Sequence, residues 1–211
     1  WEATGGEITP TGLFMASNKP GSYLVRASHP DSAEVWEAPV IIGPAKIPDG
    51  RLRHWLVLGP FPDTDDTGLE KSQIPEATVT PSHNVSCEQL RWKSAYGENN
   101  YLDLAATCSP NQHVLAYAHV YILAPNDLNC NLVYGSDDGI RLWLNGELLQ
   151  SLHVRRAPDP NQNTTPIALK AGWNRLLVKV DQMTGSWGFY MRLKSPDGAP
   201  LPELYYALDA P

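Results

Sequence analysis

Alternating hydrophobic and polar positions, not a helical repeat, organise most of this chain. The clearest case is residues 114–123, where Ala116, Ala118, Val120 and Ile122 alternate with Leu115, Tyr117, His119 and Tyr121. A period of two predicts a β-strand. We expect the small apolar set to face the core, which leaves two tyrosines and a histidine on the other face. No segment carries a helical pattern, so the sequence predicts an all-β chain.

The stretch from Gly135 to Leu149 reads GSDDGIRLWLNGELL and predicts a turn followed by a β-hairpin. Asn145-Gly146 is the strongest two-residue signal for a type I′ turn, and it sets Leu144 opposite Glu147. One face of the hairpin then carries Ile140, Leu142, Leu144 and Leu149, and the other carries Arg141, Trp143, Leu148 and Gln150. The first set predicts a core face. The second set is either covered by a loop or open for contact.

Turn signals divide the chain into units. The main domain, residues 54–211, holds about eight to ten short strands, which predicts a β-sandwich with jelly-roll connections. Residues 1–44 are a shorter series of strands, and residues 45–53 are a linker or a turn into the main domain. Residues 63–88 and 152–166 lack periodicity, so we expect two long loops, the first of them over the sandwich. Loops of that length inside a domain often carry function.

Composition narrows the classes of partner. The 211-residue chain has a formal net charge of −7 and no basic stripe, which argues against nucleic-acid binding. No apolar run approaches the length of a membrane span. The three cysteines are too few and too widely spaced for a disulfide scaffold or a zinc site. Cys87 and Cys108 could still pair, and Cys130 is expected to be a small buried hydrophobe.

Two resemblances to known families follow from these motifs. Within residues 1–44, the order WEATGG, GLFMA, PGSYLVRAS and a closing strand near Val40 resembles the later half of a bacterial immunoglobulin-like domain. From Trp55 to about Pro200, the segments WLVLGPFP, AYAHVYILAP, GSDDGIRLWLNGELL, AGWNRLLVKVDQ and GSWGFYMRL resemble a galactose-binding-like jelly-roll accessory module. Such modules are common in large secreted bacterial proteins, many of them carbohydrate-active enzymes. The SDDG run is also similar to the protective-antigen-type carbohydrate-binding domain, in which adjacent aspartates hold calcium.

Catalytic signatures are missing from the sequence. It has no G-x-S-x-G elbow, no H-E-x-x-H motif, no phosphate loop and no dinucleotide fingerprint, so we expect no enzyme activity. The doublets Asp65-Asp66 and Asp137-Asp138 lie in turn-like sequence, where Asp is favoured for local hydrogen bonding. Asp137 and Asp138 are candidate calcium ligands by resemblance and by carboxylate chemistry, with turn capping as the alternative.

Sugar binding requires an aromatic plane for the apolar face of a pyranose and polar groups for its hydroxyls. The candidate ligand-binding residues are Trp187, Arg155, Arg156, Asp159, His153 and Trp143. Trp187 follows a glycine turn, which is typical of a rim position. The loop arginines could instead form a solvated surface, or a clasp that ties their loop to Asp137 or Asp138.

These observations favour a non-catalytic carbohydrate-binding or accessory module, secreted or on the cell surface of a bacterium. Its expected partners are a polysaccharide or glycan and neighbouring domains of the same polypeptide. The alternative is a structural spacer or protein-interaction module with no sugar ligand. An exposed Trp on a concave face favours binding, whereas fully buried tryptophans favour the spacer.

Overall fold

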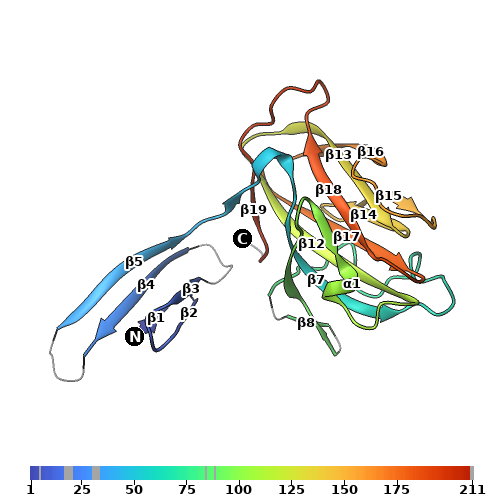
Figure 1. The fold of residues 1–211 in the computed structure, drawn as a ribbon. Helices are drawn as coiled ribbons and strands as arrows, with labels where there is room; N and C mark the ends of the chain where they lie inside the picture. The colour runs from blue at the N-terminus through green and yellow to red at the C-terminus, as the bar shows by residue number, and fades with distance from the viewer. Residues whose placement is uncertain (5, 17–20, 30–33, 84, 88, 210–211) are drawn as a thin grey trace.

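The computed structural model describes the chain except for positions 5, 17–20, 30–33, 84, 88 and 210–211. Two antiparallel sheets pack face to face as a β-sandwich, and a smaller β unit precedes them (Figure 1). Helical structure in the described residues is limited to α1 (Leu104–Thr107) and a 3₁₀ turn, η1 (Pro48–Gly50). None of the described helices is long and apolar enough to cross a membrane. The predicted all-β sandwich is confirmed, and the jelly-roll connectivity stays a prediction.

The larger sheet carries the long central strands of the sandwich. In spatial order its strands are β10 (Lys93–Tyr96), β7 (His54–Pro62), β12 (Val114–Ala124), β17 (Gly172–Gln182), β14 (Ile140–Leu144) and β15 (Glu147–Leu152). The end of β12 also pairs with β19 (Tyr205–Ala207), which pairs with β6 (Ala45–Lys46). The central pair β12–β17 runs in register from Val114 opposite Gln182 to Ala124 opposite Gly172.

The smaller sheet covers one face of the larger sheet. Its strands, in spatial order, are β11 (Tyr101–Asp103), β18 (Gly188–Lys194), β13 (Leu128–Asp137) and β16 (Asn163–Leu169). A two-stranded ribbon, β8 (Ser86–Cys87) with β9 (Leu90–Arg91), lies outside both sheets.

The main core lies between the two sheets. Trp55 of β7 meets Phe189 of β18 edge to face, with ring centroids 5.0 Å apart. Val57 shares this face of β7 and pairs with Ala118 of β12, so the small apolar side of β12 also faces the smaller sheet. All of these side chains are at most 1% exposed. The predicted core face of residues 114–123 is therefore confirmed.

The opposite face of the larger sheet is buried as well. Tyr117 and His119 are 0% exposed, and the Tyr117 hydroxyl donates to Glu76 in the segment of residues 63–83 (2.7 Å). The predicted loop over the sandwich is thus confirmed for residues 63–83, whereas the end of the predicted range contains strand β8. The same face carries Trp143, which is 5% exposed, so this tryptophan is covered and does not form a contact surface.

The central hairpin has the predicted turn. Asn145 and Gly146 have φ of 53° and 91°, as a type I′ turn requires, and Leu144 pairs with Glu147. The register shifts between Leu142 and Trp143, so that Trp143 faces Leu148 but Leu142 faces Gln150. A bulge therefore makes Leu149 an extra residue without a cross-strand partner, but Leu149 still packs against the core, as predicted.

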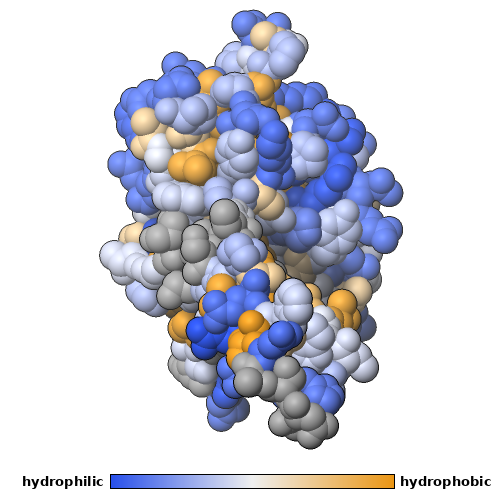
Figure 2. Space-filling model, turned by 90° about the vertical axis from the view of Figure 1, so that its left-hand side faces the viewer, coloured by the Kyte–Doolittle hydropathy of each residue, from blue (hydrophilic) through white to orange (hydrophobic). Residues whose placement is uncertain are grey.

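The N-terminal unit forms two small sheets. One contains β1 (Glu2–Ala3), β4 (Gly21–Ser28) and β5 (Val35–Ile42), and the other pairs β2 (Gly6–Ile8) with β3 (Phe14–Ala16). Strands β4 and β5 project away from the sandwich as a long ribbon (Figure 1). Trp36 on β5 is 72% exposed. The face of the molecule in Figure 2 shows hydrophobic residues as separate small patches among hydrophilic ones. The likeness of residues 1–44 to part of an immunoglobulin-like domain stays a prediction.

The segment of residues 45–53, predicted to be a linker, belongs to the sandwich. Strand β6 pairs with β19, and Leu52 donates its N–H to the backbone oxygen of Met191 in β18 (3.2 Å). Ile47 and Leu52 are buried in the core. The three cysteines are free, so the Cys87–Cys108 disulfide left open by the sequence does not form, and Cys130 is buried as predicted.

The Asn145 turn can be tested by two substitutions. The Asn145 side chain accepts the N–H of Arg175 (2.8 Å) and donates to Asn174 (3.0 Å), in addition to tolerating positive φ. Asn145→Ala loses all three contributions and should lower the free energy of unfolding by about 2 kcal/mol. Asn145→Gly keeps the backbone freedom and should cost less. Chemical denaturation measures both, and equal stabilities of Asn145→Ala and wild type would contradict the turn assignment.

His119 predicts a pH dependence of stability. Its Nδ1–H donates to the Leu176 backbone oxygen (3.1 Å), and burial lowers the pKa of its imidazole to about 3 from 6.5. Below pH 6.5 the unfolded chain binds a proton that the folded chain does not bind until about pH 3. The free energy of unfolding therefore falls as the pH drops through this window.

His119→Gln keeps a donor for Leu176 but does not titrate. Denaturant unfolding between pH 7 and pH 4 should show a shallower slope for the variant, by up to about 1.4 kcal/mol per pH unit. Parallel pH profiles for the variant and wild type would show that His119 does not cause the dependence.

Candidate functional site

A buried lysine holds the long loop of residues 63–83 on the larger sheet. Lys179 of β17 has none of its side chain exposed, and its Nζ donates to the backbone oxygens of Leu69 (2.9 Å) and Lys71 (2.6 Å). Nζ also pairs with the Glu76 carboxylate at 3.1 Å. Burial lowers the pKa of Lys179, and the charge of Glu76 acts in the opposite direction. Buried backbone carbonyl groups need hydrogen-bond donors, and the Lys179 ammonium supplies them for Leu69 and Lys71.

Two arginines on the same face extend this arrangement. Arg175 of β17 donates to the backbone oxygens of Glu76 (3.2 Å), Ala77 (2.5 Å) and Val79. Arg141 of β14 donates to the backbone oxygen of Glu70 (3.1 Å). The loop is thus fixed over β14 and β17 at several points along its length.

The start of the loop is a tight turn organised by a buried aspartate. Asp63 is 5% exposed, and its Oδ1 accepts the N–H groups of Thr67 (3.0 Å) and Gly68 (2.7 Å). Asp66, inside this turn, has a φ of 58°. An aspartate tolerates this left-handed conformation better than most residues. The turn brings Asp66 over the end of β17.

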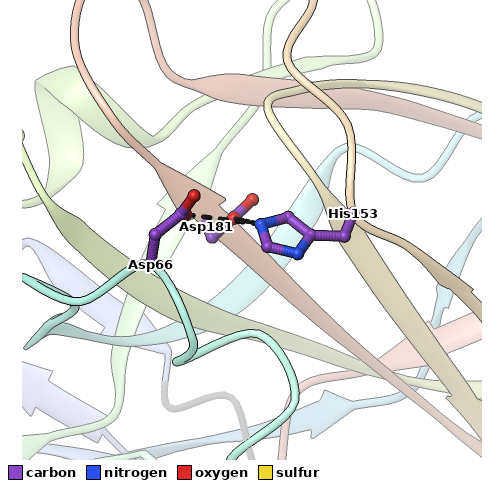
Figure 3. Close-up of side chains that lie close together, drawn as sticks. All are labelled: Asp66, His153 and Asp181. Carbon is purple, nitrogen blue, oxygen red and sulfur yellow. Dashed lines mark hydrogen bonds and ion pairs between the residues drawn. The ribbon is translucent and has the colours of Figure 1, made fainter.

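Three side chains from distant parts of the chain converge there, namely Asp66, His153 and Asp181 (Figure 3). His153 directly follows β15, and Asp181 is the second-last residue of β17. His153 Nε2 lies 3.3 Å from Asp66 Oδ1 and 3.7 Å from Asp181 Oδ2, and its Nδ1 lies 3.7 Å from Glu70 Oε1. The side chains of His153 and Asp66 are 37% and 43% exposed, whereas that of Asp181 is 1% exposed. We call these residues, with Glu70 and Arg155, the loop-end cluster.

Arg155 supplies the main positive charge of the loop-end cluster. Its guanidinium donates to Asp181 Oδ2 (2.9 Å) and also pairs with Asp66. Burial raises the pKa of Asp181, and Arg155 partly offsets that shift. Gly139 permits the close packing, because a Cβ there would lie 2.6 Å from Asp181 Oδ1. The cluster therefore joins acceptors and donors in one fixed, partly exposed arrangement.

Arg156 forms the clasp that the sequence left as an alternative. Its backbone N–H donates to Asp138 Oδ1 (3.1 Å), and its guanidinium donates to the backbone oxygen of Ser136 (3.2 Å) and to Ser136 Oγ (2.9 Å). Burial lowers the pKa of Arg156. Arg156 thus ties the loop after β15 to the turn before β14, and the predicted role of its side chain as a ligand donor is not favoured.

The predicted calcium ligands are already bonded within the protein. Asp138 Oδ2 accepts the N–H of Met183 (3.1 Å), its Oδ1 is occupied by Arg156, and Asp137 Oδ2 accepts the Ser186 hydroxyl (2.7 Å). Calcium requires several free oxygens, and a guanidinium lies 3.8 Å from Asp138 Oδ2. This donor set does not fit a calcium ion and instead fits the turn-capping alternative. In the loop-end cluster, Arg155 likewise occupies the position between Asp66 and Asp181.

Besides Arg156, three predicted ligand residues lie outside the loop-end cluster. Trp187 is 0% exposed, so the predicted rim position is wrong. Its backbone oxygen accepts the N–H groups of Leu104 (2.9 Å) and Ala105 (3.2 Å), which places α1 against it. Trp143 lies beneath the loop of residues 63–83. Asp159 is exposed and caps its own turn by accepting the N–H of Asn161 (3.0 Å).

Of the predicted polar residues, the structure places His153 and Arg155 in the cluster. It adds Asp66, Glu70 and Asp181, which sequence reasoning missed as site residues. A signal for Asp181 was present in the strand LLVKVDQ, where two charged residues alternate within an apolar run. Asp66 was recognised only as a turn residue, because nothing in the sequence shows where the loop folds back.

Comparisons with known proteins give a limited result. No family model and no curated protein matches the chain. Among solved structures, the epithelial adhesin 9 A domain of Candida glabrata in complex with Galβ1-3GlcNAc aligns at 10% identity over 79% of this chain and 94% of that chain, with a TM-score of 0.42. The subtype-switched form of that domain in complex with β-lactose aligns at 11% identity over 79% of this chain and 93% of that chain, with a TM-score of 0.41.

A β-glucosidase from Kluyveromyces marxianus aligns at 11% identity, with a TM-score of 0.41. The alignment covers 66% of this chain and only 16% of the β-glucosidase. These low values leave function to be argued from the geometry of the chain itself.

Proposed function

We propose that this chain is a non-catalytic carbohydrate-binding module that uses the loop-end cluster to bind a glycan. The observation that carries the proposal is the convergence of three partly exposed groups, the Asp66 carboxylate, the His153 imidazole and the Arg155 guanidinium. They meet at the buried carboxylate of Asp181, and the guanidinium also lies 3.8 Å from the buried Asp138. Carboxylates and guanidinium groups are suitable hydrogen-bond partners for sugar hydroxyls. The buried Asp181 and Asp138 hold the exposed groups in place, which reduces the entropy lost on binding.

A non-catalytic role is supported by the partners of His153. Within the described residues its hydrogen-bond and ion-pair partners are Asp66, Glu70, Asp181 and Arg155. None of these is a hydroxyl or thiol nucleophile that the imidazole would activate. As a part of this proposal, the module acts outside the cell, secreted or at the cell surface, beside other domains of the same polypeptide.

A structural spacer is the second candidate, and the tryptophans of the sandwich favour it. Trp55, Trp92, Trp143 and Trp187 are all at most 5% exposed. Trp173 is partly exposed, but it lies at the opposite end of β17 from Asp181. Among the described residues the loop-end cluster therefore has no exposed indole on which a sugar ring could stack, and polar groups alone bind sugars weakly in water.

Binding to a glycan array, followed by affinity electrophoresis on the best glycan, tests the proposal. Asp66→Asn replaces the exposed carboxylate with a neutral amide, and His153→Gln removes the imidazole; each should weaken binding by about tenfold. Asp159→Asn is the matched control, because Asp159 is exposed and follows His153 and Arg155 in the same loop, but lies outside the cluster. It should bind like wild type. Added calcium and EDTA should leave binding unchanged, since the Asp138 oxygens are occupied.

If wild type binds no glycan, the result contradicts glycan binding and favours the structural spacer. If Asp159→Asn weakens binding as much as Asp66→Asn, the loop-end cluster is not the site. Melting temperatures of all variants verify that the sandwich remains folded.

A further inference from the structure

A cleft lies on the sandwich where residues 46–54 meet β10 and β19. Its volume is about 150 Å³, and the lining residues that matter here are Lys46, Arg51, Arg53, His54, Tyr96 and Tyr206. None of the residues that line it is acidic, although the whole chain has a net charge of −7. Three of the lining residues are cations, namely Lys46, Arg51 and Arg53, and the cleft shares no residue with the loop-end cluster.

Aromatic rings form one wall of this cleft. The His54 ring stacks on Tyr206 with centroids 5.0 Å apart and meets Tyr96 at 4.8 Å. The Tyr206 hydroxyl lies 2.8 Å from His54 Nδ1, which fixes the imidazole. Burial lowers the pKa of His54, and the charge of Arg53 acts in the same direction. Tyr96 is 55% exposed, so part of its side chain is accessible at the edge of the cleft.

The three cations of the cleft differ in their partners. Lys46 pairs with Glu203, and Arg51 lies 3.7 Å from Asp49. Arg53 has no ion-pair partner among the described residues, and its Nε is buried without a hydrogen-bond acceptor. A donor that has lost water without gaining an acceptor is costly, and a bound anion would remove that cost. The backbone of Arg53 is fixed, because its oxygen accepts the N–H of Gly97 (2.7 Å).

We propose that this cleft binds the acidic group of an anionic saccharide, either a carboxylate or a sulfate. The Arg53 guanidinium offers the planar pair of donors that such oxyanions accept. The exposed ring of Tyr96 offers a surface for the apolar face of the sugar that carries the acidic group. The volume suits one charged group with part of its ring, so neighbouring sugars of the chain would lie outside the cleft.

Affinity electrophoresis of the full chain in gels containing sodium polygalacturonate, dextran sulfate or neutral dextran tests this site. The first two probes distinguish a carboxylate from a sulfate, and the third removes the charge. Wild type should be retarded by at least one acidic polymer and not by dextran. Arg53→Gln should weaken that binding by about tenfold or more, and Arg53→Lys, which keeps the charge but loses the planar pair of donors, should weaken it less.

Tyr96→Ala should also weaken binding, and this exposed position keeps the test valid if Arg53→Gln fails to fold. Arg91→Gln removes an exposed positive charge outside the cleft and should change affinity by less than about twofold. The glycan selected on the array, added as a free competitor, should leave retardation by the acidic polymer unchanged, which separates this site from the loop-end cluster.

Three results would overturn the proposal. One is the absence of retardation by both acidic polymers. A second is an equal loss of affinity in Arg91→Gln and Arg53→Gln, which would indicate attraction by net charge alone. A third is equal binding of poly-glutamate, which would show that the cleft selects negative charge without selecting a saccharide.

Discussion

The backbone carbonyls of the loop over the larger sheet impose the main constraint on this structure. Residues 63–83 cross a sheet face without forming strands, so their buried oxygens need donors that the sheet ladder does not provide. Lys179, Arg175 and Arg141 supply those donors from β17 and β14. Glu76 neutralises Lys179 at 3.1 Å and accepts the Tyr117 hydroxyl at 2.7 Å. A buried pair of this kind adds little net stability but leaves a costly lone charge if one partner is lost.

This arrangement links packing to the candidate site. Because the loop is fixed from Leu69 to Val79, the turn before it stays in place and directs Asp66 toward Asp181. On the other side, Arg156 and Asp138 fix the segment that carries His153 and Arg155. The exposed groups of the loop-end cluster are thus supported by buried charges on both sides. The cleft around Arg53 lies elsewhere and depends on residues 45–53, where β6 and Leu52 attach to β19 and β18.

Local sequence patterns predicted the features that depend on local chemistry. The alternation in residues 114–123 identified the core face of β12, and Asn145-Gly146 identified the turn and its first cross-strand pair. Features set by tertiary contacts were not predictable in the same way. Trp187 follows a glycine turn and suggested a rim, but its side chain is buried and its backbone oxygen bonds the start of α1. The bulge at Leu149 and the partners of Asp66 likewise depend on segments far away in the sequence. Lys179 was visible as a charge in an apolar strand, yet only the fold shows that its partner is a loop.

Hydrogen exchange measures directly whether Lys179 holds the loop of residues 63–83 on the sheet. In Lys179→Met, loop amides such as those of Gly68 and Val79 should exchange much faster, while amides of the central strands β12 and β17 keep most of their protection. The free energy of unfolding should fall by about 3 kcal/mol, because Glu76 is left buried without its cation. Lys71→Met is the matched control, since that lysine is 59% exposed and should have little effect. Unchanged loop protection in Lys179→Met would contradict the account.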